Sequence, residues 1–432
     1  MIVRNEAHTL RPCLESVAAV VSQIVVADTG STDATPAIAR EFGASVINVP
    51  WADHFANARN AALVPLTTDW VLVLDADEEL DCIAKQRIPK LLTRREVGGY
   101  LTPIRNYVPV ASGRGWDRAT QPNDRTHPRA AHAPAYFVHE NCRLFRRHPE
   151  IYFVGRVHEL VEPRIAALGM KLPMADFSIH HFGNLTETES RLLKAAAYRD
   201  LLRLKVQELP DDPMAWLQLG LQEYECSRES AEPMRCLEHA LALEPSAAQA
   251  WLFKGMILLD GGRFSEALAA LDNLGPSTAL SQHLRGDALH NLGCFQEARS
   301  AYAEAAKLSS DDPVVISKLG YTEIRLGMIK PGIARLQRAA SAAPHLADIQ
   351  ERLMKAYVAV GRWTRAAEQA EKWAAVEATP KAYLRAVSIR VYLKQNDQAR
   401  EILFRGMDLF PDSPDLKRAF SELGGQRQPD AL

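Results

Sequence analysis

A regular repeat, with a period of about 34 residues, runs through the second half of this 432-residue chain and constrains its fold more than any other feature. Segments of similar pattern begin at positions 230, 264, 295, 329, 363 and 397, so their spacing is nearly constant. Apolar and small residues recur in them at helical spacing, and strand signals are absent from about residue 211 onward. One such unit cannot bury its apolar face alone, so the period predicts helical pairs stacked on a shared core.

Small residues mark the first helix of most pairs, at Gly220, Gly255, Gly286, Gly320 and Ala356, and prolines close most units. Together with the length of the period, these features resemble the tetratricopeptide (TPR) repeat. The resemblance implies an all-α superhelix of about six repeats over residues 206–432, closed by an amphipathic last helix at residues 415–423. The leucines, alanines and aromatic residues of the repeats are interpreted as packing rather than as a cofactor site.

Residues 1–80 have a different pattern, in which short apolar runs alternate with helical runs. We expect strands at residues 1–3, 23–28, 45–49 and 70–74, with helices at residues 8–20, 35–42 and 53–62 between them. Near-continuous apolar strands separated by helices predict an α/β domain with a mostly parallel sheet. The first strand starts at Met1, so either this strand is short or the true start of the chain lies upstream.

Polar residues stand at the C-terminal ends of the predicted strands, namely Asn5, Glu6, Asp28, Asp75 and Asp77. Right-handed crossovers place these ends along one edge of a parallel sheet, where open α/β sheets bind ligands. Asp75 and Asp77 are two positions apart in WVLVLDADEEL, so on a strand their carboxylates would point the same way. Because a buried carboxylate costs roughly several kcal/mol without a compensating charge, we expect Mg²⁺ or Mn²⁺ there, with a phosphate-bearing ligand.

The segment between the two halves is basic. Residues 102–157 hold nine arginines against four acidic residues, with histidines at 127, 132, 139 and 148 and a fifth just beyond the range at 158. Turn-forming residues are frequent from Asn106 to Phe137, so this part is expected to be loop. The positive charge would suit an anionic ligand such as a phosphate-bearing substrate, and a solvated loop surface is the alternative.

Composition excludes several classes of protein. The net charge of −2 offers no electrostatic footprint for nucleic acid or an anionic membrane. Six cysteines are scattered without a CxxC pair, which argues against a zinc ribbon or a disulfide framework and for a reducing compartment. The sequence shows no signal peptide and no apolar run long enough to span a membrane, so we expect a cytoplasmic protein, peripheral to a membrane at most.

Four motifs follow one another in an order that is typical of one enzyme family. IVRNEA, VVADTGSTDAT, FANARNAAL and WVLVLDADEEL resemble the successive motifs of family-2 glycosyltransferases, and the similarity continues through residues 142–163 and 178–191. The resemblance extends over roughly residues 1–205, nearest to the bacterial non-processive branch that often carries tetratricopeptide repeats. It implies a GT-A catalytic domain, Rossmann-like and mostly parallel, at residues 1–205 and the TPR superhelix at residues 206–432.

The resemblance also implies a nucleotide-sugar pocket in this domain. Asp28 would contact the base or ribose of the nucleotide, and Asn5 and Glu6 would line the same pocket. Arg59 and Asn60 would lie near the nucleotide. Thr29 follows Asp28 where the family often has a second aspartate, which leaves the choice of nucleotide open, with a UDP-sugar favoured.

Three residues are implied in holding the diphosphate and its metal. Asp75 would face the ribose, and Asp77 would hold Mg²⁺ or Mn²⁺ on the diphosphate, with Asp75 beside it. His181 resembles a late histidine that in many such enzymes reaches back to the metal. The metal and the basic segment would neutralise the departing nucleoside diphosphate.

The acceptor side needs a general base. Glu159 is the first candidate, His158 is a second candidate for base or metal ligand, and Glu140 in FVHE is a rival that the sequence leaves open. The base would take a proton from the acceptor as it attacks the anomeric carbon, and a single in-line displacement would invert that carbon. The QxxRW motif is absent, which argues against a processive polysaccharide synthase.

The acceptor and the purpose of the repeats stay open. The acceptor is expected to be a peptide or protein, or a lipid-linked or surface glycan, and the repeats would bind it, recruit a protein partner or form a homo-oligomer. A binding scaffold with an inactive glycosyltransferase-like domain is the alternative function. A nucleotidyltransferase is disfavoured, because RNEAHTLRP after the first strand lacks the glycine-rich phosphate loop of that class.

Overall fold

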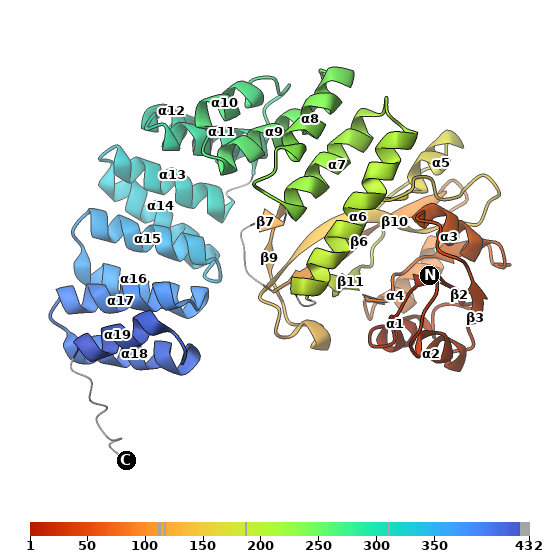
Figure 1. Cartoon of the computed structure of the whole chain (residues 1–432), viewed down its shortest axis with the longest axis horizontal. Coiled ribbons are helices and arrows are strands. Elements are labelled where there is room, and N and C mark those ends of the chain that lie inside the picture. Colours follow the sequence, from red (N-terminus) through yellow and green to blue (C-terminus); the bar gives the residue numbers. More distant parts are fainter. Residues whose placement is uncertain (110–113, 116–117, 186–187, 310–311, 424–432) are drawn as a thin grey trace, which may run out of the picture. The chain divides into compact units, whose positions relative to one another are not determined.

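The computed structural model describes residues 1–423 apart from residues 110–113, 116–117, 186–187 and 310–311 (Figure 1). The chain forms two compact units, one of residues 1–247 without the undescribed residues 110–113, and one that begins at Ala248. The predicted domain boundary at residues 205/206 falls inside helix α6 (Thr188–Glu208). The first unit therefore also contains one helical pair, α7 (Pro213–Cys226) and α8 (Glu232–Leu243).

A parallel three-stranded sheet, ordered β1-β2-β3, forms one part of the first unit. Helices cover both of its faces, since Val26 packs with α1 and α2 while Val25 and Ala27 pack with α3. The elements alternate as the sequence predicts: β1 (Ile2–Val3), α1 (Leu10–Val17), β2 (Val25–Asp28), α2 (Thr35–Glu41), β3 (Ser45–Asn48) and α3 (Phe55–Leu63). The predicted α/β class is confirmed.

Strand β4 (Trp70–Leu72) does not continue this sheet, which corrects the expectation of a fourth parallel strand. It pairs antiparallel with β10 (Ala135–Arg146), with Leu72 opposite Leu144. β10 belongs to a second sheet, ordered β4-β10-β6-β11-β5, in which β11 and β6 form the one parallel pair between described strands. The remaining strands of the unit are β5 (Glu78–Leu80), β6 (Gly99–Val108), β7 (Arg114–Gly115), β8 (Arg118–Ala119), β9 (Gln121–Pro122) and β11 (Ile179–His181).

The expectation of a loop from Asn106 to Phe137 is wrong at both ends. β6 runs through Val108 and β10 begins at Ala135, and these two residues pair with each other. The pairing continues to Phe145 opposite Gly99, so a long antiparallel ribbon forms the middle of the second sheet. Residues 110–113 and 116–117, at the centre of the expected loop, lie outside the described residues. The unit also holds α4 (Ala84–Leu91), α5 (Glu162–Ala167) and two short 3₁₀ helices, η1 (Pro128–Ala130) and η2 (Gly183–Leu185).

The helical pairs follow the predicted period. The first helices are α7, α9 (Ala248–Asp260), α11 (Ala279–Asn291), α13 (Pro313–Arg325), α15 (Ala347–Ala359) and α17 (Pro380–Tyr392). The second helices are α8, α10 (Phe264–Leu271), α12 (Phe295–Leu308), α14 (Ile329–Ala342), α16 (Trp363–Glu377) and α18 (Asn396–Leu409). The predicted last helix is α19 (Pro414–Glu422), whose buried Leu416 joins the core of the preceding pairs. Over the described residues, none of the helices has the length and apolar character that a membrane crossing requires.

Small residues in the first helices let the second helices approach closely, and Gly286 shows this clearly. A Cβ at Gly286 would lie 2.5 Å from Cε1 of Tyr302 on α12. The Tyr302 hydroxyl donates to Asp287 at 2.6 Å, so the ring would lose this bond if it turned away. Gly286→Ala should therefore destabilise the second unit by about 1–3 kcal/mol, measured by denaturant unfolding followed by helical circular dichroism.

Gly275 provides the matched control for that substitution. It lies in the same unit, and an added Cβ there would meet nothing within 4 Å. Gly275→Ala should leave the unfolding midpoint unchanged. If both variants lost the same stability, close packing over Gly286 would not be the reason for its glycine.

Candidate active site

Asp75 and Asp77 lie between β4 and β5, where the chain turns, rather than on a strand. The strand geometry that would point both carboxylates the same way therefore does not apply. Each carboxylate has its own set of partners: two arginines contact Asp75, and a histidine contacts Asp77.

Buried arginines compensate the charge of Asp75. Arg59 Nη2 lies 2.9 Å from Asp75 Oδ1, and Arg143 Nη2 lies 3.1 Å from Asp75 Oδ2. Burial alone would raise the pKa of Asp75, but the two guanidinium groups hold it well below its usual range. Two protein cations thus compensate the charge of Asp75, and the metal expected there stays a prediction.

Glu78 completes this network from the start of β5. Its side chain is 2% exposed and accepts hydrogen bonds from Arg143 at 2.7 Å and from the backbone N–H of Asp75 at 2.9 Å. The bond from the Asp75 N–H to Glu78 links the start of the Asp75–Asp77 turn to the first residue of β5. Glu78 belongs to WVLVLDADEEL, yet nothing in that motif distinguishes this structural glutamate from Glu79 beside it.

Arg143 reaches the site because β10 is irregular there. The pairing of β10 with β6 shifts between Cys142 and Leu144, which is a β-bulge at Arg143. Such a bulge changes the direction of a side chain, and bulges are frequent next to active sites. Sequence reasoning found an excess of arginines in this segment but could not identify Arg143 among them, since a bulge has no clear sequence signal here.

Asp77 faces His181 at the end of β11. Asp77 Oδ2 lies 3.4 Å from His181 Nε2, and Asn106 Oδ1 lies 2.7 Å from His181 Nδ1. Burial alone would lower the pKa of His181, but the Asp77 carboxylate raises it above its usual value. Asn106 orients the ring so that Nε2 points to Asp77, which is the kind of support that metal-binding histidines have.

The residues at Asp77 fit a divalent cation with few protein ligands. Gly183 leaves space at this pair, because a Cβ there would lie 2.5 Å from Asp77 Oδ2 and 2.7 Å from His181 Nε2. Among the described residues, no group of three or more histidine, cysteine, aspartate or glutamate side chains is arranged to hold a metal. Mg²⁺ commonly takes one or two carboxylates from the protein and the rest of its ligands from water and substrate phosphates. Asp77 and His181 agree with that pattern, whereas Asp75 is occupied by arginines.

Asn5 and Glu6 come after β1 and Asp28 is the last residue of β2, so all three stand at the C-terminal ends of the first two strands, as predicted. Asp28 is 9% exposed and accepts from the backbone N–H of Ser31 at 3.0 Å. Asn5 has a φ of +56° and accepts from the backbone N–H of Thr32 at 2.8 Å, so both side chains hold the loop after β2.

Glu6 is close enough to Asp77 for the two carboxylates to interact electrostatically. Its pKa is raised, first by burial and then by the charge of Asp77, while a hydrogen bond from the Thr9 hydroxyl at 2.6 Å opposes the rise. Glu6 and Asp77 therefore belong to one electrostatic site, although they come from the ends of different sheets.

Arg59 and Asn60 are neighbours on α3 with different environments. Arg59 is 9% exposed and pairs with Glu159 as well as with Asp75. Asn60 accepts from the backbone N–H of Phe153 at 2.8 Å and donates to its carbonyl at 2.9 Å. Asn60 thus links α3 to the segment before α5. Its place near the nucleotide stays a prediction.

The three candidate bases occupy different surroundings. Glu159 is paired with Arg59, and its side chain is 10% exposed. His158 is exposed, has a φ of +54°, and its ring centre lies 6.1 Å from that of Tyr198. Glu140 follows His139 on β10, so the alternation of the strand directs it to the opposite face of the sheet from His139, which contacts Asn106.

Comparisons with known proteins found a glycosyltransferase family model and a repeat-containing relative. The family model described as "Glycosyl transferase family 2" matches residues 1–151. A TPR repeat-containing protein of Synechococcus elongatus is 32% identical over 318 residues, which are 71% of this chain and 71% of that protein. An uncharacterized glycosyltransferase of Rickettsia felis is 35% identical over 101 residues, which are 23% of this chain and 35% of that protein. The chain thus matches only about a third of the rickettsial protein.

Among solved structures, PilW, a type IV pilus biogenesis factor, is similar to 48% of this chain over 98% of its own length. Its sequence identity is 18% and its TM-score is 0.42.

Proposed function

Because the chain belongs to a family of TPR repeat-containing proteins and carries a family-2 glycosyltransferase domain, we propose that it transfers a sugar from a nucleoside-diphosphate donor to an acceptor. The observation that carries the proposal is the arrangement at the Asp75–Asp77 turn. There Asp77 and His181 stand together beside a space that Gly183 leaves open, while buried arginines hold Asp75 in place.

The residues divide the work of donor binding. Asp77 and His181 would hold Mg²⁺ or Mn²⁺, and the ion would stabilise the negative charge of the departing diphosphate. Asp75, fixed by Arg59 and Arg143, is preorganised to accept hydrogen bonds from the ribose. Asp28, Asn5 and Glu6 would line the nucleotide pocket from the loops after β1 and β2.

The acceptor side is proposed to use Glu159 as the general base. Its carboxylate is held by Arg59, which ties the base to the same network that positions Asp75. The base takes a proton from the acceptor hydroxyl, amine or thiol, the acceptor atom bonds to the anomeric carbon, and the bond from that carbon to the diphosphate oxygen breaks. One displacement of this kind inverts the configuration of the sugar carbon.

The donor can be identified by thermal shift. The full chain would be screened against UDP-, GDP- and dTDP-sugars, each with and without Mn²⁺. A rise in unfolding temperature that needs both one class of nucleotide and the metal supports the proposed site, because a ligand that binds the folded state stabilises it by mass action. A chain that responds to no nucleotide with or without Mn²⁺ would favour the inactive scaffold instead.

The helical repeats are proposed to bind the acceptor, either a peptide or protein or a glycan. The unit boundary suggests a truncation after Ala247, which keeps α6, α7 and α8 with the glycosyltransferase domain. This shorter protein should hydrolyse the donor at the rate of the full chain but lose transfer to the natural acceptor by at least about tenfold, an affinity change of about 1.4 kcal/mol. Full transfer activity in the truncated protein would rule out acceptor docking by residues 248–432.

A further inference from the structure

Helix α6, which leads from the sheets to the first helical pair, lies beside the candidate active site. Its Tyr198 stacks on Phe55 at the start of α3, with the two ring centres 5.5 Å apart. Burial raises the pKa of the Tyr198 hydroxyl, and the nearby carboxylates of Asp75 and Glu159 raise it further. The face of α6 that carries Tyr198 is therefore turned toward the residues of the candidate site.

Lys194 lies on the same face of α6, one helical turn before Tyr198. Its side chain is exposed, and it forms no ion pair with any residue that the structure describes. Burial raises the pKa of Glu6, and the charge of Lys194 opposes this rise. Burial would also raise the pKa of Asp77, but a hydrogen bond with His181 lowers it, and Lys194 adds to that lowering. The ammonium group of Lys194 is thus within electrostatic reach of two carboxylates and paired with neither.

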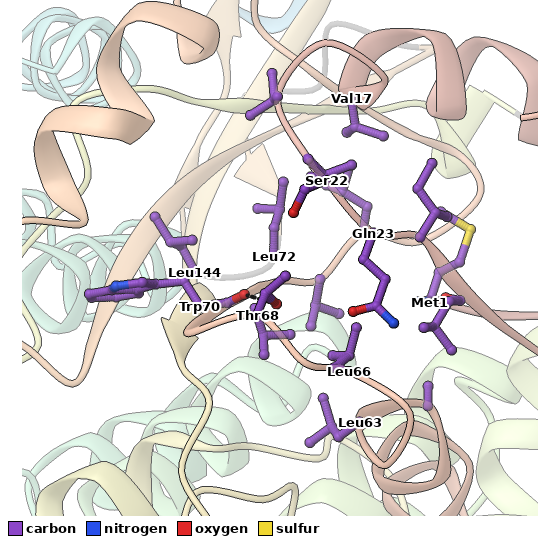
Figure 2. A pocket seen from close by; sticks show the side chains of 18 of the residues that line it. Met1, Val17, Ser22, Gln23, Leu63, Leu66, Thr68, Trp70, Leu72 and Leu144 are labelled. Atoms are coloured by element: carbon purple, nitrogen blue, oxygen red, sulfur yellow. Dashed lines mark hydrogen bonds between the residues drawn. The ribbon is translucent and has the colours of Figure 1, made fainter. Parts of the chain in front are cut away.

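The two buried arginines of the site are already engaged with protein carboxylates. Arg143 pairs with Asp75 and Glu78, and Arg59 pairs with Asp75 and Glu159. Arg59 also stands in the wall of an apolar pocket of about 520 Å³, which Figure 2 shows from close by. Apolar walls offer a phosphate group no polar partner, so this pocket is unsuited to a diphosphate. A diphosphate bound at the site would therefore need a cation other than these arginines.

We propose that Lys194 is a further donor-binding residue, whose ammonium group contacts the diphosphate of the nucleotide-sugar beside Asp77. The inference rests on the proposed function and adds to it a phosphate contact from the helix that leads into the repeats. A lysine suits this role, because its ammonium group is a compact charge on a flexible stem that can reach a phosphate oxygen. Its charge would also offset the repulsion between the diphosphate and the carboxylates of Glu6 and Asp77.

Calorimetry on the full chain with Mn²⁺ tests the proposal, using UDP, GDP and dTDP as ligands. For whichever nucleoside diphosphate binds, Lys194→Ala should weaken binding by about tenfold or more, because a contact between a charged donor and phosphate is lost. Lys194→Arg keeps the positive charge and should bind within about threefold of the unsubstituted chain. The unfolding temperature without ligand should be the same in all three proteins, since the side chain of Lys194 is exposed.

Lys85→Ala is the matched control, because Lys85 is an exposed lysine on another helix of the same unit, α4. It should bind the nucleoside diphosphate as the unsubstituted chain does. Unchanged affinity in Lys194→Ala would overturn the proposal, and so would an equal loss of affinity in Lys194→Arg or in Lys85→Ala.

The unsubstituted chain separates this inference from the proposed function. If it bound none of the three nucleoside diphosphates, the proposed function would fail and the role of Lys194 would fail with it. If it bound one of them and Lys194→Ala bound it equally well, the proposed function would stand and only the role of Lys194 would be wrong.

Discussion

Asp77→Ala is expected to lower metal-dependent sugar transfer by about a thousandfold or more while the fold stays intact. The side chain of Asp77 is 18% exposed, and His181 is the one ion-pair partner described for it, so its loss leaves the hydrophobic core unchanged. Burial would raise the pKa of Asp77, but the hydrogen bond and charge of His181 lower it below its usual value. The carboxylate is therefore charged at neutral pH and able to bind a cation.

The measurement pairs transfer kinetics with Mn²⁺ titration by calorimetry. Asp176→Ala is the matched control, because Asp176 is a half-exposed aspartate that pairs with Arg87 at 3.4 Å, away from the Asp75–Asp77 turn. The control should keep both transfer and Mn²⁺ affinity, and Asp77→Ala should lose both. Unchanged Mn²⁺ affinity in Asp77→Ala would remove the metal assignment, whatever happened to the rate.

The repeats could be predicted from the sequence almost to the residue. Each unit places small and apolar residues at the same positions, so the pattern recurs at a fixed period. The starts of α10, α12, α14 and α16 therefore coincide with predicted positions. The first three strands were equally predictable, because each is a short apolar run between helices. In both regions the sequence pattern that predicts the structure lies within a short segment or recurs at a fixed distance along the chain.

The second sheet could not be predicted in the same way. β4 pairs with β10, which is distant in the chain, and nothing within WVLVL specifies a partner so far away. The contacts within the candidate site were also difficult to predict, because they join residues that are distant in the sequence. Asp75 could be selected from its motif, but the compensation of its charge by Arg59 and Arg143 depends on α3 and on a bulge in β10. Sequence reasoning therefore found the acids but did not find that Arg59 and Arg143 pair with Asp75.

Glu159→Gln is expected to lower the transfer rate by about 10²–10⁴-fold, the usual contribution of a general base. A glutamine can still accept a hydrogen bond from Arg59, so the link from Arg59 to Asp75 at 2.9 Å should persist. Donor affinity should then change by less than about threefold, because the group lost acts in the transition state rather than in the bound donor complex. Transfer rate and donor dissociation constant are measured on the same preparation.

Two further variants separate a base from a positioning residue. Glu140→Gln should leave the transfer rate and the donor dissociation constant near those of the unsubstituted protein. Strand alternation places Glu140 on the opposite face of the sheet from His139. Arg59→Lys removes the guanidinium group that pairs with both Glu159 and Asp75. It should therefore weaken donor binding and transfer together. If Glu159→Gln behaved like Arg59→Lys, with equal losses in both quantities, Glu159 would act through Arg59 on the donor site. The exposed His158 would then be the base to test next, by His158→Ala under the same two measurements.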